Sequence, residues 1–454
     1  MMKNARHVSR IFFFLLSILV PLFARAGDPV QTQPMVITLD TALAMALEQN
    51  RDILIADQER HKADAQIGEA RSGALPQLWI NGSYSRYFLK QVLFLPPNSM
   101  INPTNREQAL EIGSDNAYIG TAQISQTLFS RKLGAAMDIA ESYHDYSEQA
   151  YRGTREDVAL QVKKAFYAVL LAEKLVQANR QGLDVVKANF ENVQSQFRHG
   201  TAAEFDLLRA EVQLANTEPL LTSAENGLLL AGNALKSILA LPLETPMKVE
   251  GSFTFEEMDS TLFREGRQNA MAANPILTQL SLQESMLEQN ISIEKANYWP
   301  ALGLVGNYQW MTQTNTFKFS NYFWAKMLSV GISIQWSIFD GFRTGARVEQ
   351  ATVDKMKIHY ARLKAEEGVK IQIQAAELKM AEARKRIAGQ EKNIKQAEKA
   401  VQIAQTRYKS GVGTQLELLD TQVAMTRAQT VYAQAIYDFL VARAEWQYAV
   451  GSPA

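Results

Sequence analysis

The sequence contains two copies of one plan, and this duplication constrains the fold more than any other feature. "LPQLWINGSYS" (from Leu75) matches "WPALGLVGNYQ" (from Trp299) at an offset of 224 residues, while "RHGTAAEFDLL" (from Arg198) matches "KSGVGTQLELLD" (from Lys409) at an offset of 211. Because insertions collect in loops, the change in offset predicts a longer loop at about 92–116 in the first copy. A shorter loop is predicted at about 315–323 in the second copy.

The segments that flank these loops alternate with a period of two residues, which is typical of β-strands. We expect one β-hairpin at about 77–130 and another at about 301–339. Apolar side chains on one face and small polar ones on the other are typical of a transmembrane barrel strand, although a soluble sandwich with one wet face gives the same pattern. If the strands lie in lipid, the outward-facing residues of the second hairpin are Leu302, Leu304, Tyr308, Trp310, Leu328, Val330, Ile332, Ile334 and Trp336.

Between the strands and the glycines of the second match, the sequence has the heptad pattern of a coiled coil. The two copies keep one register: Leu183, Val186, Phe190, Val193 and Phe197 each have a counterpart 211 residues later, at Ile394, Ala397, Val401, Ala404 and Tyr408. We expect long helices at 131–199 and 343–409, each about 100 Å long at 1.5 Å per residue. Return helices are expected at about 204–239 and 415–450, after tight turns at Gly200 and Gly411, since glycine tolerates positive φ.

The chain begins with features of an export signal. A basic start, an apolar run at 11–23 and the small-x-small sequence "ARA" at 24–26 predict a signal peptide over residues 1–26, with an uncleaved anchor as the alternative. The rest divides into a first repeat at 27–240 and, at 241–454, a linking segment followed by the second repeat. The absence of cysteine excludes a disulfide framework and a lipid-modified cysteine.

Composition also argues against several functional classes. Without the signal peptide the net charge is about −4, which is no basis for nucleic-acid binding. The five histidines stand singly, so no metal-ligand spacing appears. No phosphate-binding loop, zinc-protease motif or nucleophile elbow is present. We therefore expect no metal, no cofactor and no enzyme activity.

Four strands per chain cannot close a barrel, which needs about eight. An open sheet edge in lipid would leave backbone groups unpaired, at several kcal/mol each. If the strands lie in a membrane, several chains must therefore share one barrel. Three chains would supply twelve strands, and their helical hairpins would form a tube beneath.

In order and spacing, the duplicated plan, the strand-end segment "IFDGFRTGA" and the tip "RYKSGVGTQLELLD" resemble the TolC-like outer-membrane efflux proteins over essentially the whole mature chain. The resemblance implies a mainly α fold with a membrane β part: a homotrimer whose 12-stranded β-barrel, four strands per chain, continues into a 12-helix α-barrel in the periplasm. It also implies a passive exit duct in the outer membrane for a tripartite efflux pump or a type I secretion system. The partners would be a periplasmic adaptor, an inner-membrane transporter and outer-membrane lipid.

The resemblance further implies a constriction at the helical tips. Acidic rings of the family lie six and nine residues beyond the second tip glycine, which gives Glu417 and Asp420 here. Asp206 and Tyr408 match an aspartate and a tyrosine whose link holds the family's entrance shut. Two alternatives stay open, because two acids on a helix often form only a solvated face and Tyr408 also occupies a heptad position.

The tip turns are the family's docking place for the adaptor, which here implies Gly200, Thr201, Gly411, Val412 and Gly413. The alternative is that the glycines only close the hairpins. Where the best-known relatives carry an arginine two residues past the second tip glycine, this chain has Gly413, and its outer acidic ring is glutamate rather than aspartate. Both departures put part of the closed-state lock in doubt.

Two other classes of protein combine some of these features. A periplasmic adaptor also has helices and β structure, but with one hairpin between lipoyl halves, whereas this chain has two hairpins and no lipoyl-like cluster of short strands. A surface-exposed coiled-coil structural protein would account for the heptads alone. The sequence does not indicate the exported cargo.

Overall fold

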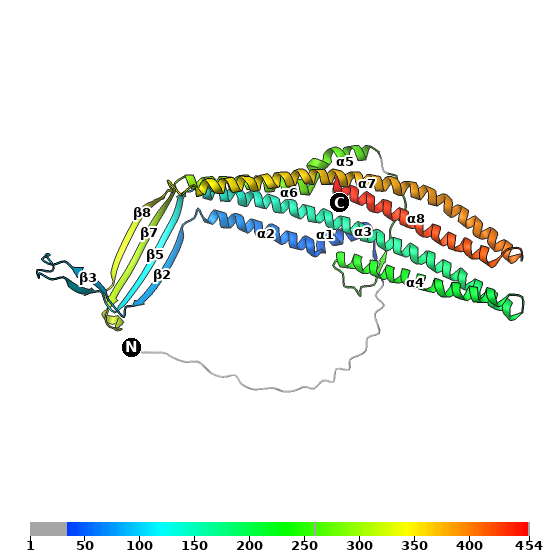
Figure 1. The fold of residues 1–454 in the computed structure, drawn as a ribbon, viewed down its shortest axis with the longest axis horizontal. Helices are drawn as coiled ribbons and strands as arrows, with labels where there is room; N and C mark the ends of the chain where they lie inside the picture. Colours follow the sequence, from blue (N-terminus) through cyan, green and yellow to red (C-terminus); the bar gives the residue numbers. More distant parts are fainter. Residues whose placement is uncertain (1–33, 258–259, 453–454) are drawn as a thin grey trace, which may run out of the picture.

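The computed structural model describes residues 34–257 and 260–452, which form a long layer of helices with one four-stranded sheet at its end (Figure 1). The predicted signal peptide lies outside the described residues. In chain order the elements are β1 (Met35–Ile37), α1 (Leu39–Gln49), α2 (Arg51–Ser72), β2 (Gln77–Arg86), β3 (Gln91–Leu95), β4 (Gln108–Ile112), β5 (Asn116–Phe129), α3 (Arg131–Arg198), α4 (Glu204–Ile238), β6 (Met247–Val249), α5 (Ser260–Ala273), α6 (Pro275–Lys295), η1 (Ala296–Tyr298), β7 (Ala301–Thr314), η2 (Phe319–Asn321), β8 (Ala325–Gln335), α7 (Arg343–Lys409) and α8 (Gln415–Ala449).

The large sheet is antiparallel, with the strand order β2-β5-β7-β8. Directly paired residues share a face of a sheet, so the registers give the composition of each face. One face, the apolar face, carries mainly apolar residues, with the charged Arg86 and Lys326 near the ends of β2 and β8. Its apolar residues include Leu78, Ile80, Tyr84, Ile124, Leu302, Leu304, Tyr308, Trp310, Leu328, Val330, Ile332 and Ile334. The opposite face, the polar face, carries residues such as Asn81, Ser83, Thr121, Gln123, Asn307, Gln309, Ser329, Ser333 and Gln335.

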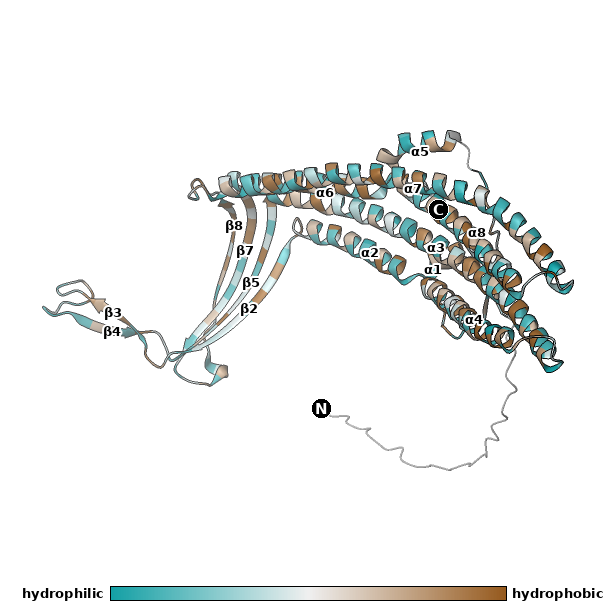
Figure 2. Ribbon diagram, turned by 45° about the vertical axis from the view of Figure 1, so that its right-hand side comes forward, coloured by the Kyte–Doolittle hydropathy of each residue, from teal (hydrophilic) through white to brown (hydrophobic). Residues whose placement is uncertain are grey.

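The sheet differs from the sequence-based expectation at two places. The region 92–116, expected as a loop, contains the hairpin β3–β4, which extends beyond the large sheet and away from the helices (Figure 2). Trp336, expected as an outward strand residue, lies one position beyond β8. Its indole Nε1 donates to the Tyr298 carbonyl at 3.1 Å. The strand ends there because Ala301, the first residue of β7, already pairs with Gln335, and the preceding Pro300 has no N–H to donate.

The two long helices start differently. Ser130 is the N-cap of α3, and its hydroxyl accepts from the Leu133 N–H at 3.2 Å. Asp340 follows the last strand of the second repeat as Ser130 follows that of the first, but it lies two residues before the N-cap of α7, which is Phe342 in a left-handed conformation. Its carboxylate still accepts from the Thr344 N–H at 2.9 Å. Within residues 34–257 and 260–452, no helix has an apolar stretch of membrane-spanning length.

Helices and strands form one continuous wall that is four elements wide. Next to the sheet, the helices pack in the order α2-α3-α6-α7, and each connects to the strand at the same lateral position: α2 to β2, α3 to β5, α6 to β7 and α7 to β8. Towards the other end, the order is α4-α3-α8-α7. Hydrophobic and hydrophilic residues are interspersed along the exposed strands and helices (Figure 2). The lateral edges of the wall are open in both its sheet and its helical part.

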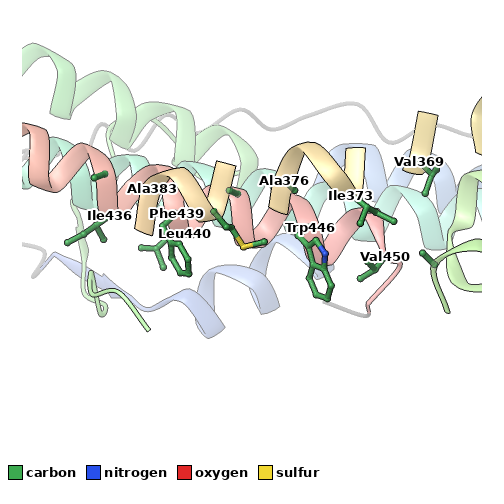
Figure 3. Close-up of a cluster of buried hydrophobic side chains, with 14 of the residues drawn as sticks. Val369, Ile373, Ala376, Ala383, Ile436, Phe439, Leu440, Trp446 and Val450 are labelled. Carbon is green, nitrogen blue, oxygen red and sulfur yellow. The ribbon is translucent and has the colours of Figure 1, made fainter. Parts of the chain in front are cut away.

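The core lies midway along the helices, where the two repeats meet. One cluster surrounds Phe166 and the parallel pair β1–β6. A second joins α7 and α8, and Figure 3 shows its side chains. In it, the edge of Phe255 meets Phe439 with ring centroids 4.7 Å apart, and Phe263 meets Trp446 at 5.0 Å. These aromatic contacts pack the segment after β6 and the helix α5 against α8. The strands β1 and β6 and the helix α5, which carries Phe263, were not expected as separate elements.

Candidate functional site

The two helical hairpins end in turns of the same geometry at the end of the molecule opposite the sheet (Figure 1). Gly200 and Gly411 both have φ +75°. Beyond Gly411, the Val412 N–H donates to the Arg407 carbonyl at 3.1 Å, and the first turn makes the equivalent bond at 2.9 Å. These bonds define a helix end closed by a left-handed residue. A Cβ at either glycine would meet no heavy atom within 4 Å, so backbone conformation alone selects glycine.

Gly413 has a different physical reason. A Cβ there would lie 2.9 Å from the Cβ of Arg407 and 3.0 Å from the Tyr408 nitrogen. The Gly413 N–H donates to the Arg407 carbonyl at 3.0 Å, so the chain passes directly over the end of α7. This close approach explains the glycine within the chain itself, and its part in docking a partner stays a prediction.

The first turn of α8 places its acids on the exposed side. Thr414 caps the helix, with its hydroxyl accepting from the Glu417 N–H at 3.2 Å. Glu417 and Asp420 are exposed, whereas Leu418 and Leu419 are buried. Because residues three apart share a helix face, the two carboxylates form one acidic edge just beyond the tip turn.

Arg407 also belongs to this site, although sequence reasoning did not single it out. Its Nε lies 3.6 Å from Glu417 Oε2, and its Nη2 donates to the Val412 carbonyl at 3.4 Å. Both charged side chains are about half exposed, so the pair adds little to stability. It does draw Glu417 back towards its own hairpin. The pair joins the last turn of one helix to the first turn of the next, a relation that spacing rules within a single helix do not detect.

Asp206 and Tyr408 lie near each other without a direct bond. Asp206 is half-buried in the first turn of α4. Burial raises the pKa of the Tyr408 hydroxyl, and the negative charge of Asp206 raises it further. Asp206 is therefore within electrostatic reach of the tyrosine. Among the described residues no hydrogen bond joins the two side chains, so their predicted link is a proximity in this structure.

The tip thus gathers carboxylates, an arginine and a tyrosine at the end of an elongated hairpin pair. Crowded carboxylates attract cations. Within the part of the chain that the structure describes, no three histidine, aspartate or glutamate side chains lie close enough to hold a metal ion.

Comparison with known proteins agrees with this architecture. The family model described as "Outer membrane efflux protein" matches residues 42–241 and 266–452. The chain is 21% identical to the alkaline protease secretion protein AprF of Pseudomonas aeruginosa over 409 residues, which cover 90% of this chain and 83% of AprF. It is also 21% identical to the outer membrane protein TolC of Vibrio cholerae over 441 residues, covering 96% and 95% of the two chains.

A solved structure shows the same fold. The CmeC outer membrane channel of Campylobacter jejuni superimposes with a TM-score of 0.75 at 17% identity, over 91% of this chain and 85% of CmeC. The predicted TolC-like fold is therefore confirmed. The family model covers both repeats and far more than half of the sequence, and this chain belongs to the outer membrane efflux protein family.

Proposed function

We propose that three copies of this chain form one passive exit duct across the outer membrane and the periplasm, which serves a tripartite efflux pump or a type I secretion system. The observation that carries this proposal is the wall itself. Strands and helices share one lateral order, and both parts end in open edges on the same two sides. A wall of this kind encloses a passage only when copies join side by side.

The sheet edges supply the strongest physical argument for such joining. Every residue of β2 and of β8 is exposed, and each strand has a neighbour on one side only. About half of the backbone groups of an edge strand point outward, and each would cost several kcal/mol in lipid if unpaired. Pairing β8 of one copy with β2 of the next removes every edge. Three copies give twelve strands, enough to close around a passage.

Both helical edges carry exposed apolar stripes, the one on α7 near the sheet and the one on α4 near the tip. On α7 and α4, exposed apolar residues recur at spacings of three and four, the pattern of a helix face that packs on another helix. They are Val353, Met356, Tyr360 and Leu363 on α7, and Phe205, Leu208 and Val212 on α4. Alone, the chain leaves these side chains in water. Packing α7 of one copy against α2 and α4 of the next would bury them, at about 1.5–3 kcal/mol per fully buried side chain.

Around a three-fold axis, Glu417 and Asp420 would form two stacked rings of three carboxylates. In the closed state these rings would narrow the entrance and bind polyvalent cations. Opening would swing the α7–α8 hairpins outward and separate Asp206 from Tyr408. Arg407 would supply a positive charge at this tip, because Gly413 stands where the best-known relatives carry an arginine. Its ion pair would hold the Glu417 carboxylate against its own hairpin.

The duct needs partners to drive export, and the tip turns are the proposed docking surface. Val412 is exposed at the second turn, and Thr201 and Gly200 are exposed at the first. A periplasmic adaptor would bind these turns and couple them to an inner-membrane transporter. The chain itself would act as a conduit and not as an enzyme.

Conductance across planar lipid bilayers tests the gate. Glu417→Ala combined with Asp420→Ala should raise single-channel conductance and raise the La³⁺ concentration for half block by about tenfold or more, the scale of electrostatic focusing in a charged cleft. Glu244→Ala with Glu250→Ala is the matched control, because it removes two exposed acids far from the tips. Unchanged conductance and unchanged block in the tip variant would refute the gating assignment.

Two further variants separate the roles of the neighbouring residues. Arg407→Gln should strengthen La³⁺ block, because it frees the Glu417 carboxylate from its ion pair. Tyr408→Phe should raise conductance if the hydroxyl helps to hold the entrance closed. An unchanged Tyr408→Phe channel would assign this tyrosine to helix packing alone.

A further inference from the structure

A pocket of about 360 Å³ lies where the sheet meets the helices, and most of its charged lining is positive. We call it the basic pocket. Arg131 and Lys132 reach it from the start of α3, and Arg343 and Arg347 reach it from the start of α7. Asp340 is its one acidic lining residue. The guanidinium of Arg131 lies 4.2 Å above the centre of the Trp299 ring, a stacking contact that positions this side chain.

The positive charge of the basic pocket is only partly compensated. Arg347 lies 4.0 Å from Glu294 of α6. In the described part of the chain, the side chains of Arg131, Lys132 and Arg343 form no ion pair within 4 Å. However, the pKa of Asp340 is lowered by hydrogen bonds from Thr344 and also by the charge of Arg343. The Asp340 carboxylate is occupied by the N–H and hydroxyl of Thr344. The N-terminal ends of α3 and α7 add the partial positive charge of their aligned peptide dipoles.

Sheet register shows which side of the wall the pocket opens on. Ala301 and Gln335 pair directly across β7 and β8, and both line the basic pocket. They belong to the polar face, which also carries Ser333 and Asn307. None of the polar-face residues of β2, β5, β7 and β8 is charged. In the proposed assembly the polar face lines the conduit, so the basic pocket lies in its interior at the foot of the sheet.

We infer that the three basic pockets form an anion-binding ring inside the conduit, in its neck, which is the level where the sheet meets the helices. This ring binds solutes that carry phosphate groups. Guanidinium groups bind phosphate oxygens through two parallel hydrogen bonds, and each pocket presents three of them with one lysine. The interior is then polarised, with carboxylates at the tips and cations at the neck. This inference rests on the proposed function, because it needs the polar face to line the passage.

Block of the channel by inorganic tripolyphosphate, added on the sheet side of a planar bilayer, tests the inference. Wild-type channels should be blocked, and Arg343→Gln combined with Arg347→Gln should need about tenfold more tripolyphosphate for half block. Arg343→Lys with Arg347→Lys keeps the charge but loses the bidentate geometry, so its block should be intermediate. Lys236→Gln with Lys248→Gln removes one half-buried and one exposed lysine midway along the molecule and should match the wild type.

The outcomes separate the possible errors. Channels of normal conductance with equal block in the wild type and the double glutamine variant would overturn the anion-binding ring alone. A wild-type trimer that conducts no ions would overturn the proposed function. A phosphate of a lipid headgroup offers the same chemistry, so block is measured in zwitterionic and in anionic bilayers. Equal block in both supports a site inside the conduit, whereas block lost only in anionic bilayers would assign the pocket to lipid and overturn the inference.

Discussion

Adjacent residues of β8 should respond in opposite ways to the same added charge, because they lie on opposite faces of the sheet. Val330 is at the middle of the strand on the apolar face and is 70% exposed in the single chain, while Ser329 lies on the polar face. A lysine at the lipid-facing midplane costs about 2–4 kcal/mol. Three copies would therefore make Val330→Lys cost about 6–12 kcal/mol per trimer. This is comparable to the whole stability of an ordinary folded protein, about 5–15 kcal/mol.

Ser329→Lys would instead place its ammonium in the water of the passage. Its effect on stability should stay within about 0.5 kcal/mol, as for most surface substitutions. The assay is refolding into lipid vesicles, followed by urea titration and by the heat-dependent migration of the trimer on gels. Val330→Lys should fail to insert, and Ser329→Lys should give wild-type amounts of trimer. Equal behaviour of the two variants, or failure of Ser329→Lys alone, would refute the assignment of the faces.

Two further predictions concern the tip turn and the acid stability of the helical layer. Gly411→Ala should destabilise the folded protein by roughly 1–2 kcal/mol, because alanine is strained at a left-handed φ. Gly413→Ala should destabilise it by roughly 1–3 kcal/mol, because the added Cβ would overlap the end of α7. Calorimetric unfolding measures both effects, and two neutral substitutions would contradict the turn geometry. Glu445 joins α3 to α7 through Lys164 at 2.8 Å and Lys379 at 3.0 Å. Burial acts to raise the pKa of Glu445, but hydrogen bonds and charge from the two lysines outweigh it and lower the pKa. The stability from this bridge is therefore present above the pKa of an unfolded glutamate, about 4.3, and is lost as pH falls through the lower folded value. Urea unfolding between pH 3 and 7 should show that Glu445→Gln removes this part of the acid sensitivity, and an unchanged profile would contradict it.

The sequence predicted the elements that have a local period. The alternation around Val330 and the heptads around Val193 each repeat along one segment, so strand, helix and exposed face can be predicted without knowing any partner. The tip glycines could be predicted equally well, because a left-handed residue at a helix end favours glycine whatever the turn contacts. Duplication strengthened all of these, since each pattern occurs twice.

What the sequence did not predict depends on contacts between distant segments. The strands β1 and β6 have three residues each and pair Met35 with Met247, so neither contains a full period. Strand endings were overestimated, as for Trp336, because alternation continues in the sequence where backbone pairing stops. The Arg407–Glu417 pair and the packing of Gly413 both require the path of the chain through the turn. The basic pocket likewise combines the starts of two helices that lie more than 200 residues apart.

The central claim is that each copy supplies one third of a shared wall, and cysteine cross-linking of the sheet edges tests it most directly. The natural chain has no cysteine, so every disulfide would come from an added pair. Each pair has one cysteine in β2, such as Ser83→Cys, and one in β8, such as Ser329→Cys. A series of variants moves one of the two cysteines along its strand, so that several pairing registers are tested. Within one chain β2 and β8 are separated by two strands, about 14 Å at the usual strand spacing, too far for a disulfide. The account predicts covalent trimers, and no larger species, on non-reducing gels at one or more registers. Chains that stay monomeric at every register, in a preparation that conducts ions, would contradict it.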